Sequence, residues 1–299
     1  MNKIPIGDTI VFAYSFVFVH IGTIVGIAGI PAVLSAAIDY GVRNLAAAQR
    51  AALDAGDAGA VGLNLAVWLG GLIATIFLSS IATVGITRAA LGQRLERAVY
   101  LTVGRTELRM FAAKLRFWLG VLALAALVGL IAVLAFSLAG IPFDAAAPNG
   151  PPDPAVFLAS LIVWVVIGYA LATALRMGFL LPATVVVEDK GGLRRSYDLT
   201  RGNAWRLVAI AFGLGAPIFV LVSVAAFAVL GSMLGGDSVQ VLEQATMTDF
   251  VRRGELAVQQ NLLAWEIFNA VIFILASGLI YSGSAYAYRA LTPGRGKNL

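Results

Sequence analysis

The sequence predicts an all-α, polytopic membrane protein with six transmembrane helices. First, six apolar runs each exceed the roughly 20 residues that a helix needs to cross the hydrocarbon core. Second, 60% of the residues are hydrophobic and 12% are charged, whereas a soluble domain is about one quarter charged. Third, lysine and arginine concentrate in alternate connections between the runs. A chain of this composition cannot cover itself with polar surface, so we expect lipid to surround it.

The six runs predict one integral membrane domain over residues 1–299. They cover residues 10–38, 61–87, 117–141, 155–181, 207–234 and 262–288. None alternates polar and apolar residues as a barrel strand does, so each is predicted to be a helix. The first run is longer than the apolar core of a signal peptide, and we expect it to remain as a span. Pro31 predicts a kink or an end in the first helix, and Pro217 predicts a kink or a local opening in the fifth.

The positive charge predicts the orientation. Sixteen lysine and arginine residues precede the first run, follow the last, or lie in residues 88–116 and 182–206, and four lie in the other connections. The positive-inside rule therefore places both termini in the cytoplasm. The same distribution explains the high pI of about 9.7 as juxtamembrane charge attracted to anionic lipid, so no nucleic-acid partner is expected.

The two long basic connections resemble each other. Residues 95–104 and 193–202 share five identities in ten positions. Each places apolar residues on one helical face and arginines on the other, which predicts two amphipathic helices in the cytoplasmic interface, ended by Gly104 and Gly202. The similarity predicts three pseudo-repeated hairpins, with chance resemblance as the alternative. The arginines expected to contact lipid headgroups are Arg94, Arg97, Arg105, Arg194 and Arg201.

The segment from Arg176 to Arg206 carries a more specific pattern. An arginine in a span is followed by a proline, a glutamate, an Arg-Ser pair, a Leu-Thr-x-Gly sequence and a tryptophan. These residues are Arg176, Pro182, Glu188, Arg195, Ser196, Leu199, Thr200, Gly202 and Trp205. The pattern resembles the glycerophosphoryl diester phosphodiesterase membrane-domain family, also called YciC-like proteins. The resemblance implies a six-span protein of the bacterial inner membrane.

In some members of that family the membrane domain is fused to a phosphodiesterase. None of these 299 residues forms such a soluble domain, so the resemblance does not imply that activity. The sequence also contains no cysteine, one histidine, no nucleotide-binding glycine loop and no catalytic triad pattern. We therefore expect neither an enzyme nor a bound metal or cofactor.

Ionisable residues within spans need a partner or a route to water. For Arg176 the sequence favours an ion pair with Glu188, with snorkelling to headgroups and a transport role as alternatives. His20, near the middle of the first span, is expected to form a hydrogen bond to a neighbouring helix rather than to relay protons. Glu266 lies one turn inside the outer end of the sixth span, where we expect it to be hydrated.

Two functional hypotheses remain open. In the first, the protein contacts anionic lipid, a membrane-protein partner or another copy of itself as a scaffold or accessory subunit. In the second, it is a transporter or channel for a lipid or small solute. A transporter requires a cavity near the middle of the membrane lined by polar groups such as His20 or Arg176, whereas a scaffold predicts a filled bundle.

Overall fold

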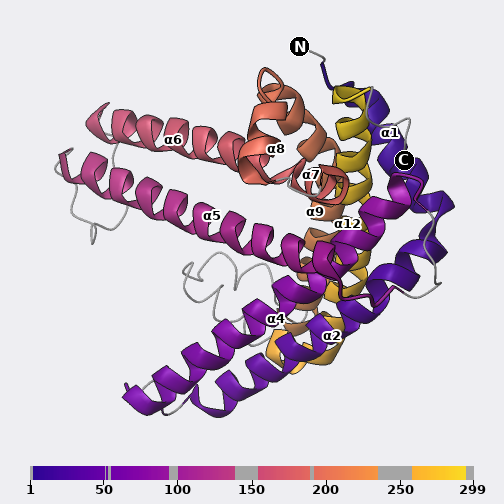
Figure 1. Ribbon diagram of the computed structural model, residues 1–299. Helices are drawn as coiled ribbons and strands as arrows, with labels where there is room; N and C mark the ends of the chain where they lie inside the picture. The colour runs from indigo at the N-terminus through magenta and orange to yellow at the C-terminus, as the bar shows by residue number, and fades with distance from the viewer. Residues whose placement is uncertain are drawn as a thin grey trace.

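The computed structural model describes residues 3–50, 52, 55–93, 100–138, 154–188, 192–234 and 258–293. All regular structure within these residues is helical (Figure 1). The helices are α1 (Ile6–Val19), α2 (Ile21–Ala48), α4 (Ala58–Ala90), α5 (Arg105–Leu138), α6 (Pro154–Gly178), α7 (Leu181–Glu188), α8 (Leu193–Leu199), α9 (Ala204–Leu234) and α12 (Leu262–Leu291).

Six helical stretches are long and apolar enough to cross a membrane. They are Ile21–Ala48, Ala58–Ala90, Arg105–Leu138, Val156–Glu188, Ala204–Ala228 and Leu262–Leu291. The all-helical class and the number of candidate spans therefore agree with the prediction of a multi-pass membrane protein. The largest difference in bounds concerns the third span, because α5 begins at Arg105 rather than at the predicted residue 117.

The first span differs from the continuous helix expected over residues 10–38. It is divided at His20, whose φ of −113° and ψ of 26° end α1 and begin α2. The imidazole Nδ1 lies 3.2 Å from the carbonyl oxygen of Phe16 in the preceding turn, and its ring stacks on the Phe16 ring at 4.7 Å. His20 is exposed, so the expected hydrogen bond to a neighbouring span is wrong. Pro31 and Pro217 both lie within uninterrupted helices.

The start of α1 and the end of α12 lie at the same end of the molecule as α7 and α8 (Figure 1). We call this the terminal end and the opposite ends of the spans the distal ends. The N-terminal segment is tied to the start of α9, since Ile4 N donates to Asn203 Oδ1 at 3.0 Å and Arg206 donates to the Ile4 carbonyl at 2.7 Å. Arg289 of α12 donates to the carbonyl of Leu91, just beyond α4.

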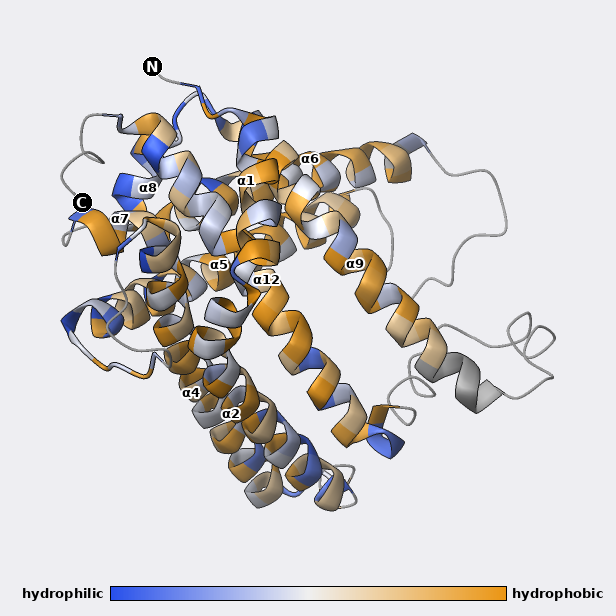
Figure 2. Cartoon of the chain, turned by 90° about the vertical axis from the view of Figure 1, so that its right-hand side faces the viewer, coloured by the Kyte–Doolittle hydropathy of each residue, from blue (hydrophilic) through white to orange (hydrophobic). Residues whose placement is uncertain are grey.

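The packed core also lies toward the terminal end. On α4, the run from Ser80 to Thr87 is buried, whereas large apolar residues nearer the start of the helix, such as Leu65 and Leu69, are exposed. The buried residues of α5 are confined to its first three turns: Glu107, Met110 and Ala113. The distal halves of the spans are mostly apolar (Figure 2), and many of their large apolar side chains are exposed. That surface suits lipid contact.

The α5–α6 hairpin projects away from the α2–α4 hairpin (Figure 1). Only one of the two predicted amphipathic helices falls within the described residues. A helix forms there as α8, and Gly202 beyond it has the expected positive φ, 76°; its amphipathic place in the membrane interface stays a prediction. In the other segment, residues 94–99 lie outside the described residues, and residues 100–104 are not helical. Gly104 instead directly precedes α5. The pseudo-repeat therefore stays a prediction.

Candidate functional site

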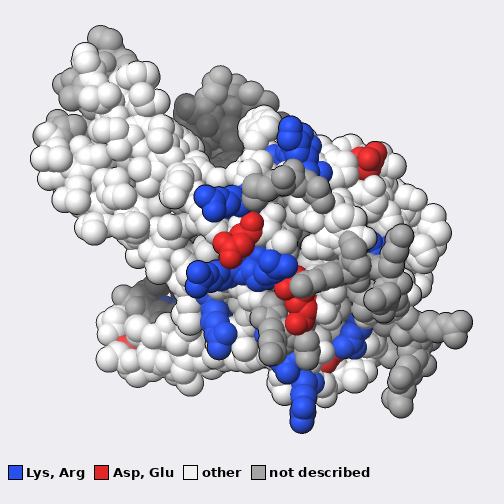
Figure 3. Space-filling model, turned by 45° about the horizontal axis from the view of Figure 1, so that its top comes forward, with Lys and Arg blue, Asp and Glu red and all other residues white. Residues whose placement is uncertain are grey.

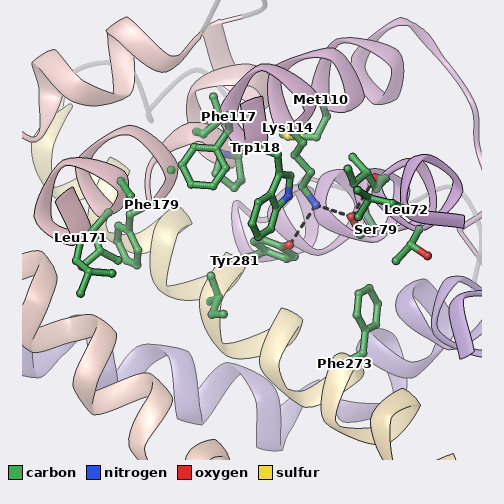
Figure 4. Close-up of a pocket in the computed structure, with 18 residues that line it drawn as sticks. Leu72, Ser79, Met110, Lys114, Phe117, Trp118, Leu171, Phe179, Phe273 and Tyr281 are labelled. Carbon is green, nitrogen blue, oxygen red and sulfur yellow. Dashed lines mark hydrogen bonds between the residues drawn. The ribbon is translucent and has the colours of Figure 1, made fainter. Parts of the chain in front are cut away.

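Lys114 lies inside α5, nine residues from the start of the helix. This distance corresponds to about 14 Å along the helix axis. The sequence predicts Lys114 to lie in the cytoplasmic connection of residues 88–116, before the third apolar run begins at residue 117. In the structure its side chain points between helices toward α4 and α12 (Figure 4).

Neutral oxygen atoms hold the Lys114 ammonium group. On α4, Nζ donates to Oγ1 of Thr83 at 2.6 Å and to the carbonyl and hydroxyl oxygens of Ser79, each at 3.0 Å. On α12, it lies 3.2 Å from the hydroxyl of Tyr281. No carboxylate of the described residues forms an ion pair with Lys114. Because its partners are neutral, the site keeps a net positive charge.

The lysine borders a cavity of about 530 Å³. This volume lies within the roughly 300–1,000 Å³ of small-molecule binding sites. The walls are mostly apolar and come from four spans; they include Leu72 and Ile76 of α4, Phe117 and Trp118 of α5, Leu171 of α6 and Phe273 of α12. The cavity therefore combines one cationic group with an apolar surface.

A glycine allows α5 and α6 to close one side of this cavity. A Cβ atom on Gly178 would lie 2.8 Å from the ring of Phe117, which is closer than real side chains approach. Small residues permit such close helix packing in membranes. Because Gly178 has no side chain, the Phe117 ring can pack against α6 and form part of the cavity wall.

A second cavity of about 230 Å³ lies farther along α4. It is bordered by Asp39 and Arg43 of α2 and by Trp68, Leu72 and Thr75 of α4. Arg43 Nε lies 3.3 Å from Oε1 of Glu266 on α12, and the Glu266 side chain is 3% exposed. Glu266 is therefore buried beside an arginine, contrary to the hydrated position expected from the sequence.

Polar residues of the family-like pattern meet at the terminal end, whereas Pro182 of the same pattern borders the larger cavity. Glu188, at the end of α7, accepts hydrogen bonds from Arg195 Nε at 2.9 and 3.1 Å, from Arg195 Nη2 at 3.1 Å, and from the hydroxyl of Tyr288 at 2.9 Å. The hydrogen bond to Glu188 raises the pKa of the Arg195 guanidinium. These contacts join α7, α8 and α12.

Arg176 does not pair with Glu188 as we expected. Its guanidinium stacks 3.7 Å from the centre of the Tyr197 ring and donates to the Tyr197 carbonyl at 3.3 Å. Its own carbonyl accepts from Ser196 Oγ at 2.9 Å and from Thr200 Oγ1 at 3.3 Å. Arg176, Ser196 and Thr200 therefore fasten the end of α6 to α8. Arg195 of α8, and not Arg176 of α6, is the ion-pair partner of Glu188.

We expect Glu188→Ala to lower the free energy of unfolding by about 1.5–3 kcal/mol, the range for hydrogen bonds to a charged group. The variant leaves Arg195 and Tyr288 without their shared acceptor. Asp198→Ala is the matched control, because this carboxylate is exposed on α8, and it should change stability by less than about 0.5 kcal/mol. Unfolding in one detergent measures both. Equal stability of the two variants would show that the Glu188 contacts are dispensable.

A second polar network joins α4 to α5. Arg88 donates to the hydroxyl of Tyr100 at 2.6 Å, and that hydroxyl donates to Glu107 Oε1 at 2.5 Å. Glu107 Oε2 also accepts from the backbone N–H of Gly104 at 2.9 Å, as the glutamate of a capping box does. Burial, and then the hydrogen bond to Glu107, raise the pKa of Tyr100. Its hydroxyl therefore remains a donor at neutral pH.

Charged residues of both signs are interleaved on the terminal end (Figure 3). Of the arginines expected to contact headgroups, Arg105, Arg194 and Arg201 are exposed, and Arg94 and Arg97 lie outside the described residues. Trp205 is 76% exposed at the start of α9, as expected of an interfacial anchor. His20 lies apart from these networks, on the α1–α2 junction.

Comparisons with protein-family models, with curated proteins and with solved structures found no match. The family resemblance of residues 176–206 therefore stays a prediction.

Proposed function

We propose that the protein is a non-enzymatic, multi-pass inner-membrane protein that binds an anionic lipid in the Lys114 cavity. The observation that carries the proposal is an ammonium group surrounded by neutral oxygens at the edge of an apolar cavity. An intramembrane lysine is costly, by about 2.5–3.5 kcal/mol on insertion scales. A negatively charged ligand would offset this cost.

The cavity walls favour an amphiphile over a free anion. Phe117, Trp118 and Leu171 offer surface to an acyl chain, and Lys114 is the charged group beside them. The shared chemistry is one acyl chain joined to a negatively charged oxygen, which both a fatty-acid carboxylate and a phospholipid phosphate provide. Exposed Arg105, Arg194 and Arg201 support the proposal, because basic residues near a membrane surface attract anionic headgroups.

The proposal includes the orientation predicted from the positive charge, with both termini in the cytoplasm. If the terminal end faces the cytoplasm, Lys114 is reached from the inner leaflet. Arg88, at the last turn of α4, then lies near the interface. Ser79 lies nine residues deeper, about 14 Å along the axis, which is close to the middle of a hydrocarbon core of about 30 Å.

Binding can be tested with brominated lipids, which quench nearby tryptophans. Trp118 lines the cavity. The difference in fluorescence quenching between the wild-type protein and Trp118→Phe gives the quenching that is due to Trp118. The purified protein is placed in phosphatidylcholine discs with increasing dibrominated phosphatidylglycerol in one series and dibrominated oleate in another. We expect at least one of the two to quench Trp118 at lower fractions than dibrominated phosphatidylcholine does.

Lys114→Met is expected to weaken this preferential binding about 10- to 100-fold, since a hydrogen bond to a charged group contributes about 1.5–3 kcal/mol. Arg116→Met is the matched control, because Arg116 is exposed and lies about 200° around α5 from Lys114. It should change binding less than twofold. Equal quenching by anionic and neutral lipids, or no effect of Lys114→Met, would contradict the proposal. The series that responds identifies carboxylate or phosphate as the ligand group.

A further inference from the structure

One face of α4 borders both cavities. Trp68, Leu72, Thr75 and Ser79 follow one another at spacings of four, three and four residues, which places them on one side of a helix. The larger cavity is lined by Leu72, Thr75 and Ser79, and the smaller by Trp68, Leu72 and Thr75. Leu72 and Thr75 are thus common to both, and the two cavities adjoin there.

The two cavities together extend along about three turns of α4. Trp68 and Ser79 are eleven residues apart, which is about 17 Å along the helix axis. This is more than half of a hydrocarbon core of about 30 Å. The larger cavity has Lys114 near its terminal end, and the smaller cavity has Asp39 and Arg43 nearer the distal end.

Thr75 has an unused hydroxyl at the junction. The hydroxyls of Ser80 and Thr83, on the same helix, donate to carbonyls one turn back at 2.7 and 2.6 Å, which is the usual arrangement within helices. The Thr75 Oγ1 atom is buried and has no hydrogen-bond partner. It is therefore a polar group beside both cavities whose hydrogen-bonding capacity no described residue uses.

The charges at the two ends differ. Lys114 has only neutral partners, whereas Arg43 lies beside Glu266 and near Asp39. An anionic headgroup is thus attracted at the Lys114 end and held more weakly at the other. Transport through a membrane requires binding that is strong enough for the ligand to enter and weak enough for it to leave.

We propose that this face of α4 is the path by which an anionic lipid headgroup moves between the leaflets, from Lys114 past Thr75 to the Arg43 cavity. The inference rests on the proposed function and adds transbilayer movement to it. Leu72 and Thr75 border both cavities and form the junction of the path.

The test uses the full-length protein in phosphatidylcholine vesicles that contain phosphatidylglycerol with a fluorescent acyl chain. Dithionite added outside destroys the fluorescence of the outer leaflet only, so lipid that crosses from the inner leaflet is lost later. We expect the wild-type protein to speed this second loss at least tenfold over protein-free vesicles. Thr75→Trp should reduce the added rate at least tenfold, because the indole fills the junction. Ile73→Trp is the control, since Ile73 is 48% exposed on another face of α4.

A cysteine variant tests the path where Thr75→Trp does not fold. The chain has no cysteine, so Thr75→Cys introduces a single thiol of nearly the same size. We expect an anionic methanethiosulfonate to modify Thr75→Cys at least tenfold faster than Ile73→Cys, because only the former lies on the path. Equal modification rates, or equal lipid movement with Thr75→Trp and Ile73→Trp, would overturn the inference.

The two proposals fail separately. If the wild-type protein binds brominated anionic lipid through Lys114 but does not speed lipid movement, the path is wrong and the binding site stands. If binding does not depend on Lys114, the proposed function is wrong, and the inference that rests on it is withdrawn.

Discussion

Replacing Glu107 with alanine is expected to lower the free energy of unfolding by about 3–5 kcal/mol, the cost of removing one partner of a buried ion pair. Glu107 is 2% exposed, and its carboxylate lies 3.5 Å from the Arg88 guanidinium. The same carboxylate accepts from the Tyr100 hydroxyl and from the N–H of Gly104. Its loss leaves Arg88 half-buried without its counter-charge and removes the contact that begins α5.

Glu107→Gln distinguishes the contribution of the Glu107 charge from that of its size and shape. The amide still accepts from Tyr100 or Gly104 but cannot neutralise Arg88, so we expect an intermediate loss of stability. Arg105→Ala is the surface control, because Arg105 is exposed in the same helical turn. Thermal unfolding of the three variants in one detergent gives the comparison. If Glu107→Ala unfolds within about 0.5 kcal/mol of Arg105→Ala, the network does not stabilise the fold.

Gly85→Val is expected to destabilise the protein by about 3 kcal/mol, the upper end of the cost of overpacking. A Cβ atom at Gly85 would lie 2.5 Å from Cγ2 of Ile27 and 2.9 Å from Cδ1 of Tyr100. Both neighbours are buried, so neither can move without disturbing the core. Displacing Tyr100 also breaks its hydrogen bonds to Arg88 and Glu107, so this change and Glu107→Ala should not be additive.

Gly120→Val is the matched control for Gly85→Val. Gly120 also lies within a long apolar helix, and a Cβ atom there has no neighbour within 4 Å. We expect a change of less than about 0.5 kcal/mol in its unfolding. Ile27→Ala removes the closest of the clashing atoms and should restore part of the stability that Gly85→Val loses. A Gly85→Val protein as stable as Gly120→Val would contradict the packing described here.

The spans were predictable because their signal is local. Length and hydropathy identify a membrane helix without knowledge of its neighbours, and the predicted bounds of the second and sixth spans differ from α4 and α12 by three residues or fewer at each end. The break at His20 was not predictable in this way, because both sides of it are apolar. Hydropathy does not change where α1 becomes α2.

The Lys114 site was missed because its parts come from three spans. Ser79 and Thr83 lie on α4 and Tyr281 on α12. These partners are far from Lys114 in the sequence, so the residues around Lys114 do not indicate them. One signal was present. Thr75, Ser79 and Thr83 place hydroxyls on one helical face at intervals of four residues within an apolar run, a pattern that indicates a polar contact inside the bundle.

The Arg176–Glu188 pair was wrong for a geometric reason. Counting charges near one another in sequence does not give the direction of a side chain, which depends on how α6, α7 and α8 pack together. In the structure Arg195 reaches Glu188, and Arg176 instead stacks on Tyr197. The segment was correctly singled out as one unit, but its partners required the tertiary structure.

The concentration of buried residues at the terminal end has a mechanical consequence. Two walls of the Lys114 cavity belong to α5 and α6, and the others to α4, α7 and α12. Because the α5–α6 hairpin is packed mainly at its base, a swing of its far end about that base changes the width of the cavity. Bilayer thickness acts on the far end of a tilted hairpin. We therefore expect thin and thick bilayers to hold the same protein with cavities of different size.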